Sequence, residues 1–258
     1  MSAEGPYRPM PTEAWGDGDP DAGKPAEAPR TVGRLGWDIT LWIALGIMGL
    51  LLLVNVAAFV AAPKGTVEQE VPQGVERMVL KVALWAATIG MLVVTGLVPL
   101  LWTIGTRVGG WAGAKRYLGL HRPGTGSLAG LGVGVLLVGA MVGLDALLRA
   151  LGVEVANPEL DGLVAVIDWP LAIAMALGAG IGEEILFRGV LQKHLGVLGQ
   201  AGLFGLFHLT QGVLGFFVTA LIGLLFGYLV RRGVPLWTVI VAHVTYDAVL
   251  LGVMLLGG

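Results

Sequence analysis

The residues of this sequence that could do chemistry are ionisable side chains embedded in apolar stretches. Such side chains cost at least a few kcal/mol each inside a lipid bilayer and are usually retained for a function. A carboxylate and a neutral imidazole that meet in a low-dielectric pocket can hold a water molecule and deprotonate it, which begins the hydrolysis of an amide. The candidates are Glu183, Glu184, Arg188, His208, His243 and Asp247.

Spacing separates the roles of the first three candidates. Glu184 and Arg188 are four positions apart with the acid first, which is the favourable order for an intrahelical ion pair, so each can neutralise the other. Glu183 points about 100° away from Glu184 on a helix and has no such partner on its own segment. We therefore expect Glu183 to face a different helix.

The second pair of candidates has the same helical spacing. His243 and Asp247 are four positions apart, so both side chains leave one helix face and can act on one ligand. Phe204 lies one turn before His208. In a hydrolytic site, one histidine would join the carboxylate that activates water, and the other histidine with Asp247 could stabilise the oxyanion. Together these groups are suited to hydrolysing an amide within a membrane.

The elements that carry these residues are predicted to be membrane-spanning helices. Of the 258 residues, 55% are hydrophobic and 13% are charged, whereas soluble domains have about 25% charged residues. Runs of about 20 apolar residues can cross a hydrocarbon core of about 30 Å as helices. We predict an all-α, polytopic transmembrane helical bundle of about seven spans, the fifth of them short or re-entrant. The expected spans are 40–62, 78–104, 128–153, 170–194, 196–210, 213–230 and 235–256.

Helical rise predicts that the candidates share one layer of the membrane. At 1.5 Å per residue, Glu183 lies roughly 16 Å from the end of its span nearer the basic loops. The same count gives roughly 18 Å for His208, 12 Å for His243 and 18 Å for Asp247. Incidental polar residues on three helices would have no reason to match in depth. We therefore expect a buried site in the cytoplasmic half of the membrane.

Charges at the span ends predict the orientation of the chain. Loops rich in basic residues favour the cytoplasmic side, so the N-terminus is expected inside and the C-terminus outside. The basic residues are Arg30, Arg34, Arg107, Lys115, Arg116, Arg122, Lys193, Arg231 and Arg232. The acidic residues of the opposite loops are Glu68, Glu70, Glu76, Glu154, Glu159, Asp161 and Asp168.

Composition divides the chain into a tail and one membrane domain. Residues 1–36 are rich in Pro, Gly and mixed charge, which predicts a disordered tail before a transmembrane domain of residues 37–258. Between the second and third spans, Trp111 and Tyr117 interleave with Lys115 and Arg116, which suits a short interfacial helix or a solvated loop equally. The glycines Gly130, Gly132 and Gly134 are expected to permit close helix packing.

The composition limits the metal ligands and the partners that the chain could have. The chain has no cysteine, so any metal would need histidine and carboxylate ligands. A net charge of −2 gives no reason to expect nucleic acid as a partner.

The other polar residues lie near span ends and are assigned no chemistry, because snorkelling or capping explains them. They are Asn55, Lys81, His194, Gln211 and the helical pair Asp145 and Arg149.

At the candidate residues the sequence resembles the CPBP family of intramembrane proteases, which includes the type II CAAX prenyl endopeptidases and the bacterial Abi proteins. The family's first motif, two glutamates followed after three residues by arginine, matches EEILFR at residues 183–188. Its second, Phe-x-x-x-His, matches Phe204 and His208, and its third, His-x-x-x-Asn or Asp, matches His243 and Asp247. The resemblance covers roughly residues 170–250, within a protease-like core of about 163–256.

The resemblance implies a glutamate-dependent intramembrane endopeptidase without a resident cofactor, in a bacterial cytoplasmic membrane. Its partners would be the lipid bilayer and a membrane-embedded or lipidated protein or peptide substrate. Residues that match Glu183 and His208 would activate water, and those that match His243 and Asp247 would bind the carbonyl oxygen. Glu184, Arg188 and Phe204 would support them.

One position departs from the usual family pattern. Asparagine is the commoner residue where this chain has Asp247. An ionised aspartate cannot donate a hydrogen bond to an oxyanion, so Asp247 must be protonated or must instead orient His243.

Other classes of function use the same residue types. Glu183, His208, His243 and Asp247 could bind zinc together in a metal-dependent hydrolase, although the sequence has no HExxH motif. Intramembrane glutamate and histidine also occur in proton-coupled transporters. A family member could also act as an immunity or scaffold protein that binds without cleaving.

Overall fold

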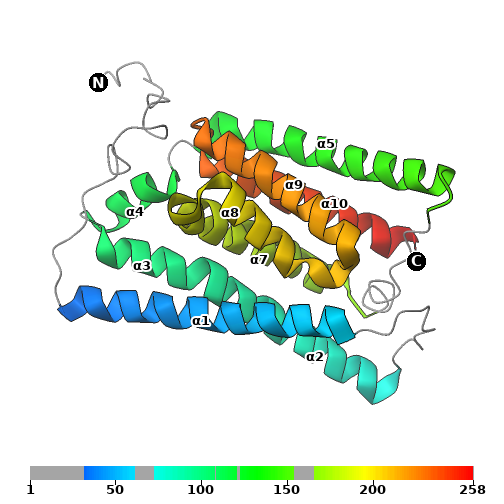
Figure 1. Cartoon of the computed structure of the whole chain (residues 1–258), viewed down its shortest axis with the longest axis horizontal. Coiled ribbons are helices and arrows are strands. Elements are labelled where there is room, and N and C mark those ends of the chain that lie inside the picture. Colours follow the sequence, from blue (N-terminus) through cyan, green and yellow to red (C-terminus); the bar gives the residue numbers. More distant parts are fainter. Residues whose placement is uncertain (1–31, 62–72, 108, 121–122, 154–165, 258) are drawn as a thin grey trace.

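The computed structural model describes residues 32–61, 73–107, 109–120, 123–153 and 166–257. Every element within these ranges is a helix, and the long helices pack lengthwise into one bundle (Figure 1). Six helical stretches in the described part of the chain are long and apolar enough to cross a membrane. Large apolar side chains such as Trp42 and Leu136, 72% and 74% exposed, cover the outer surface as a lipid-facing layer requires. The predicted polytopic helical membrane protein is confirmed.

The described elements follow one another as twelve helical segments. They are α1 (Val32–Ala61), α2 (Gly74–Met91), the π-helix η2 (Leu92–Leu97), α3 (Val98–Thr106), α4 (Trp111–Leu118), α5 (Pro123–Ala150), α7 (Trp169–Glu184), the π-helix η3 (Ile185–Leu191), α8 (Gln192–Phe207), the 3-10 helix η4 (Leu209–Gln211), α9 (Gly212–Arg231) and α10 (Leu236–Gly257).

The observed ends differ from the expected ones mainly at the N-terminus. Helix α1 begins at Val32 rather than near residue 40, so residues 32–36 of the expected tail are helical. The rest of that tail lies outside the described residues. The same holds for the acidic loop residues Glu68, Glu70, Glu154, Glu159 and Asp161.

The fourth and fifth expected spans form one helical run that bends sharply. The run Trp169–Phe207 has 39 residues, roughly 58 Å of helix and about twice the thickness of a hydrocarbon core. Gly196 breaks it, with φ 69° and ψ 179°, in a region that favours glycine. The part of α8 after Gly196 is only roughly 17 Å long. It is therefore a short segment that stops partway through the bundle and returns as α9.

Helix α7 is the central element of the bundle (Figure 1). In the most apolar stretch of the span that contains α7, 61% is buried inside the protein. In the corresponding stretches of the other five spans, at most 22% is buried. Glycines allow backbones to approach it closely. A Cβ on Gly180 would lie 2.8 Å from the Val244 nitrogen of α10, and one on Gly96 of η2 would lie 3.2 Å from the Gly182 Cα. The packing fixes α7 against two neighbours just before Glu183.

A glycine face on α5 holds α10 in place. Gly126, Gly130 and Gly134 are spaced by four and lie on one helix face. A Cβ on Gly130 would lie 2.5 Å from the carbonyl oxygen of Thr238, and one on Gly134 would lie 2.6 Å from that of Ala242. Gly132 has nothing within 4 Å of such a position. Two of the three expected packing glycines therefore serve that purpose, and Gly132 does not.

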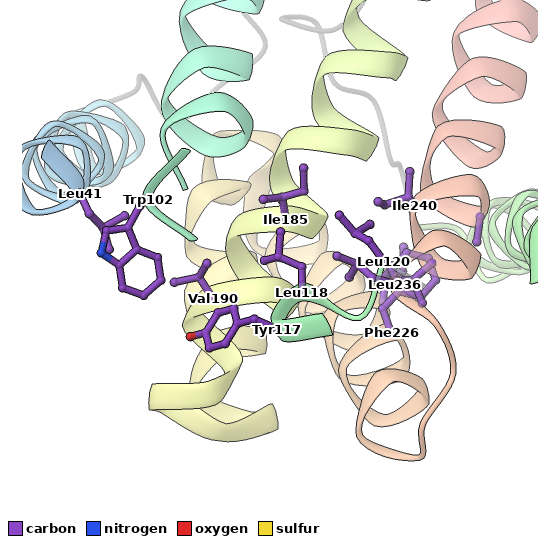
Figure 2. Close-up of a cluster of buried hydrophobic side chains, with 13 residues drawn as sticks. Leu41, Trp102, Tyr117, Leu118, Leu120, Ile185, Val190, Phe226, Leu236 and Ile240 are labelled. Carbon is purple, nitrogen blue, oxygen red and sulfur yellow. The ribbon is translucent and has the colours of Figure 1, made fainter. Parts of the chain in front are cut away.

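The short helix between the second and third spans is present as α4 and closes the basic end of the bundle. Its Tyr117 and Leu118 join Ile185, Val190 and Leu236 in an apolar cluster (Figure 2). The Arg107 guanidinium lies 3.9 Å from the centre of the Tyr117 ring, and the Lys193 ammonium donates to the Tyr117 carbonyl oxygen. Because the Leu236 nitrogen donates to the Gly119 oxygen at 3.1 Å, the start of α10 is also tied to this end.

The opposite end of the bundle is held by an ion pair between helix starts. Lys81 of α2 donates to the Asp168 carboxylate at 2.5 Å. Asp168 also caps α7 by accepting from the Leu171 nitrogen at 3.2 Å, as an N-cap aspartate does. The hydrogen bond from Lys81, and then that from Leu171, lowers the pKa of Asp168 below its ordinary value.

Candidate active site

The two glutamates stand where α7 gives way to the π-helix η3. Both are buried, with 6% of Glu183 and none of Glu184 exposed. The π-helical turn begins at Ile185, directly after them. Single π-turns inside α-helices are rare and often occur at functional sites, because they change the direction of the side chains that follow. Here the wider turn carries Arg188.

The predicted ion pair between Glu184 and Arg188 is present. Arg188 Nη1 donates to Glu184 Oε1 at 2.6 Å, and both side chains are fully buried. The guanidinium carbon also lies 4.4 Å from the ring centre of Phe204 and 5.5 Å from that of Phe226. Buried arginine is stabilised by such aromatic faces. The pair therefore joins α7 and η3 to both α8 and α9.

Glu184 has a second partner that sequence spacing did not predict. Its Oε1 also accepts a hydrogen bond from Nδ1 of His243 on α10, at 2.8 Å. Since a carboxylate that is paired with arginine only accepts, Nδ1 carries the hydrogen, which fixes the orientation of the ring. Glu184 is thus more than internal support for its own helix, because it also orients a candidate catalytic histidine.

The other nitrogen of His243 faces two more carboxylates. Its Nε2 lies 3.5 Å from Asp247 Oδ2 and 4.0 Å from Glu183 Oε2. The expected convergence of Glu183, His243 and Asp247 from α7 and α10 is therefore present. Three carboxyl groups thus surround one guanidinium and one imidazole, the two groups that can offset their buried negative charge.

Glu183 ends in an oxygen without a partner. Its Oε2 is buried and accepts no hydrogen bond from any described residue, and the same is true of Oε2 of Glu184, whose Oε1 accepts hydrogen bonds from both Arg188 and His243. Buried polar atoms are nearly always satisfied, by protein or by water, so an unpaired carboxylate oxygen needs an explanation. A water molecule or a substrate group is the kind of partner that this oxygen lacks.

His208 lies at the end of α8, half-buried. Its Nδ1 is 2.8 Å from the Phe204 carbonyl oxygen, and because a carbonyl only accepts, Nδ1 carries the hydrogen and Nε2 is left as an acceptor. The Phe204 ring stands between the two histidines, with its centre 4.8 Å from that of His208 and 6.0 Å from that of His243. The hydrogen bonds of the described residues include none between His208 and Glu183.

The arrangement does not fit a zinc site. Within the described residues, no three His, Cys, Asp or Glu side chains come together as ligands of one metal ion. His243 is engaged on both sides by carboxylates of its own cluster, Glu184 at Nδ1 and Asp247 near Nε2.

A comparison with known protein families finds a match for the segment that contains the candidate site. Residues 165–249 match the family model described as type II CAAX prenyl endopeptidase Rce1-like. The segment is about a third of the chain and contains Glu183, Glu184, His208, His243 and Asp247. The resemblance predicted from the three motifs is therefore confirmed over this segment. No curated protein and no solved structure matches the chain.

Fold and family together define the class of protein. A bundle of apolar helices with six stretches able to cross a membrane is an integral membrane protein, and its residues 165–249 resemble the type II CAAX prenyl endopeptidases. Sequence reasoning missed the bond between Glu184 and His243 and the two π-helices. The bond had no sequence signal, because it joins residues 59 positions apart.

Proposed function

We propose that the protein is a glutamate-dependent intramembrane endopeptidase that hydrolyses a peptide bond of a membrane-embedded or lipidated protein or peptide. The observation that carries the proposal is the unpaired Oε2 of Glu183, buried beside His243 in the segment that matches the peptidase family. A carboxylate so placed can accept a proton from water in a low-dielectric site. The proposal uses protein groups alone.

The proposed reaction assigns a role to each side of the site. The proposed reaction requires one water molecule to donate to both Glu183 Oε2 and Nε2 of His208, two groups that can accept. As the water oxygen bonds to the substrate carbonyl carbon, its proton passes to this pair, and protonated His243 donates from Nε2 to the developing oxyanion. The proton then moves to the amide nitrogen as the carbon–nitrogen bond breaks. Glu184 orients His243 through Nδ1, and the charge of Asp247, with Oδ2 3.5 Å from Nε2, stabilises the protonated ring.

The experiment compares peptide termini in membranes that contain the wild-type protein with those that contain Glu183→Gln. Removing a general base lowers cleavage by roughly 100-fold or more, so termini found with the wild type should be lost with the variant. Asp145→Asn is the matched control, since Asp145 pairs only with the exposed Arg149 at 2.8 Å on α5. Termini that do not differ between wild type and Glu183→Gln under any growth condition would overturn proteolysis.

The same experiment separates the competing functions. A transporter or an immunity protein that uses these residues would leave all peptide termini unchanged in Glu183→Gln. A zinc hydrolase would lose cleavage on chelation and regain it when zinc is added. The glutamate-dependent peptidase retains full cleavage in the presence of the chelator.

We also propose that the basic end of the bundle faces the cytoplasm, in keeping with the distribution of Lys and Arg. Lys115 and Arg116 of α4 are exposed at this end. Because the chain has no cysteine, single cysteines can be labelled with a membrane-impermeant maleimide in intact cells. Val75→Cys at the other end should react directly, and Lys115→Cys only after permeabilisation. The reverse pattern would contradict this orientation.

A further inference from the structure

One polar side chain of helix α1, that of Asn55, contacts the turn that contains His208. Asn55 Nδ2 donates to the Phe207 carbonyl oxygen at 3.3 Å and lies 3.5 Å from Thr210 Oγ1. These two residues stand on either side of His208. The contact spans more than 150 positions of sequence, and α1 lies outside the segment that matches the peptidase family.

The orientation of the Asn55 amide follows from its partners. The Phe207 oxygen belongs to the last turn of α8, where carbonyl groups lack intrahelical donors, so it needs a donor from elsewhere. A carbonyl only accepts, and the amide nitrogen must therefore face it. The Asn55 Oδ1 is left buried and without a partner, which costs the desolvation of that oxygen. A polar side chain kept at such cost on an apolar helix indicates that the contact with the turn is needed.

The turn interrupts the helical run between α8 and α9. His208 has non-helical φ and ψ of −105° and 12°, only three residues of 3-10 helix follow, and Gly212 then turns the chain with φ 88°. An open pocket of about 370 Å³ lies between α1 and this turn, beside the cluster in which Phe207 packs with Met48. Its lining residues include Met48, Leu51, Ala58, Met91, Phe207 and Thr210. The hydrogen bonds of Asn55 add a polar contact between α1 and this turn next to that apolar packing.

We propose that Asn55 is a positioning residue that holds the His208 turn, and with it the His208 imidazole, in place from α1. The proposal rests on the proposed function in one respect, since it takes His208 as part of the hydrolytic site. It adds a residue from outside the matched segment that acts through the Phe207 carbonyl. Asn55 itself does not touch the substrate.

The first test observes His208 directly and needs no substrate. The chain has four histidines, so labelled imidazoles in nanodiscs give few signals, and His208→Gln identifies the one that belongs to His208. Asn55→Leu should shift or broaden the His208 signal and leave that of His194 unchanged. The control is Thr40→Val, also on α1, whose hydroxyl bonds only to the Gly36 oxygen of the same helix. An unmoved His208 signal in Asn55→Leu would overturn the proposal.

The second test separates positioning from a general loss of structure. Asn55→Leu should lower kcat for peptide cleavage about tenfold with KM within about twofold, since a misplaced base slows chemistry rather than binding. Asn55→Gln keeps the amide donor and should restore part of the rate. Equal shifts of all four histidine signals with a lower melting temperature would show a purely structural role. Absence of any cleavage by the wild type would defeat the proposed function, while the histidine spectra would still decide the role of Asn55.

Discussion

At the scale of single residues, the two adjacent glutamates differ in how many partners each one holds. Oε2 is unpaired in both glutamates, but Glu184 Oε1 accepts from Arg188 and His243, whereas the hydrogen bonds of the described residues include none to Glu183. A buried charge with a buried partner stabilises the fold mainly because removing one member leaves the other uncompensated. Glu184 is thus structural as well as a support for His243, and Glu183 is available for chemistry.

The first prediction concerns stability and uses this matched pair. Glu184→Gln should lower the free energy of unfolding by about 3 kcal/mol, because Arg188 is left as a buried charge without its counterion. Glu183→Gln replaces an oxygen that makes no hydrogen bond and should change stability by less than about 1 kcal/mol. Thermal unfolding of both variants in the same detergent measures the difference. Equal destabilisation would contradict this division.

At the scale of elements, glycine faces decide how closely helices approach the site. In a membrane, helices associate through close packing, since lipid offers no soluble-type hydrophobic drive. The α5 face presents Gly130 and Gly134 to carbonyl groups of α10 one turn apart, the second of them next to His243 in sequence. A displacement of α10 would therefore move His243 relative to Glu184.

The second prediction compares two glycines on α5. Gly130→Ala should destabilise the protein by about 1–3 kcal/mol, because the new methyl group meets backbone of α10 and the helices must separate. Gly132→Ala meets nothing within 4 Å and should be neutral or stabilising by up to about 1 kcal/mol, since alanine favours a helix over glycine. Unfolding midpoints of the two variants provide the measurement. A loss of stability in Gly132→Ala as large as that in Gly130→Ala would refute the packing face.

At the scale of the whole molecule, the two ends of the bundle are closed by different chemistry. At one end, the cationic groups of Arg107 and Lys193 both lie over the Tyr117 ring. At the other end, Lys81 forms an ion pair with Asp168. The site lies between them, on helices that both closures hold. The charge pattern that predicts orientation therefore also helps to hold the bundle together.

The third prediction is the pH dependence of the Lys81 and Asp168 closure. A carboxyl whose pKa is lowered in the folded state stabilises the fold above its unfolded pKa, about 3.9, and this stabilisation is lost as pH falls through the folded pKa. Asp168→Asn should therefore lower the melting temperature at pH 7, and the difference from wild type should shrink as pH falls below about 4. Glu76→Gln, an exposed carboxylate in the first turn of the neighbouring α2, is the control. A difference that stays constant down to pH 3 would contradict the linkage.

The sequence by itself determined the membrane class, the positions of the long helices and the local pairs within them. Apolar length predicts a span, and a separation of four residues predicts that Glu184 meets Arg188 and that His243 shares a face with Asp247. Both pairs are present at 2.6 and 3.5 Å. These features depend only on helical geometry, which is the same in every helix.

Only the tertiary structure decided which groups meet between helices. The bond between Glu184 and His243 depends on how α7 and α10 rotate about their axes, and that rotation is set by contacts of glycines such as Gly180 with the facing backbone. The π-turn after Glu184 changes the helical period locally, so arithmetic from a regular helix could not follow it. For the same reason Asn55, which spacing alone assigned to a span end, proved to contact the turn of His208.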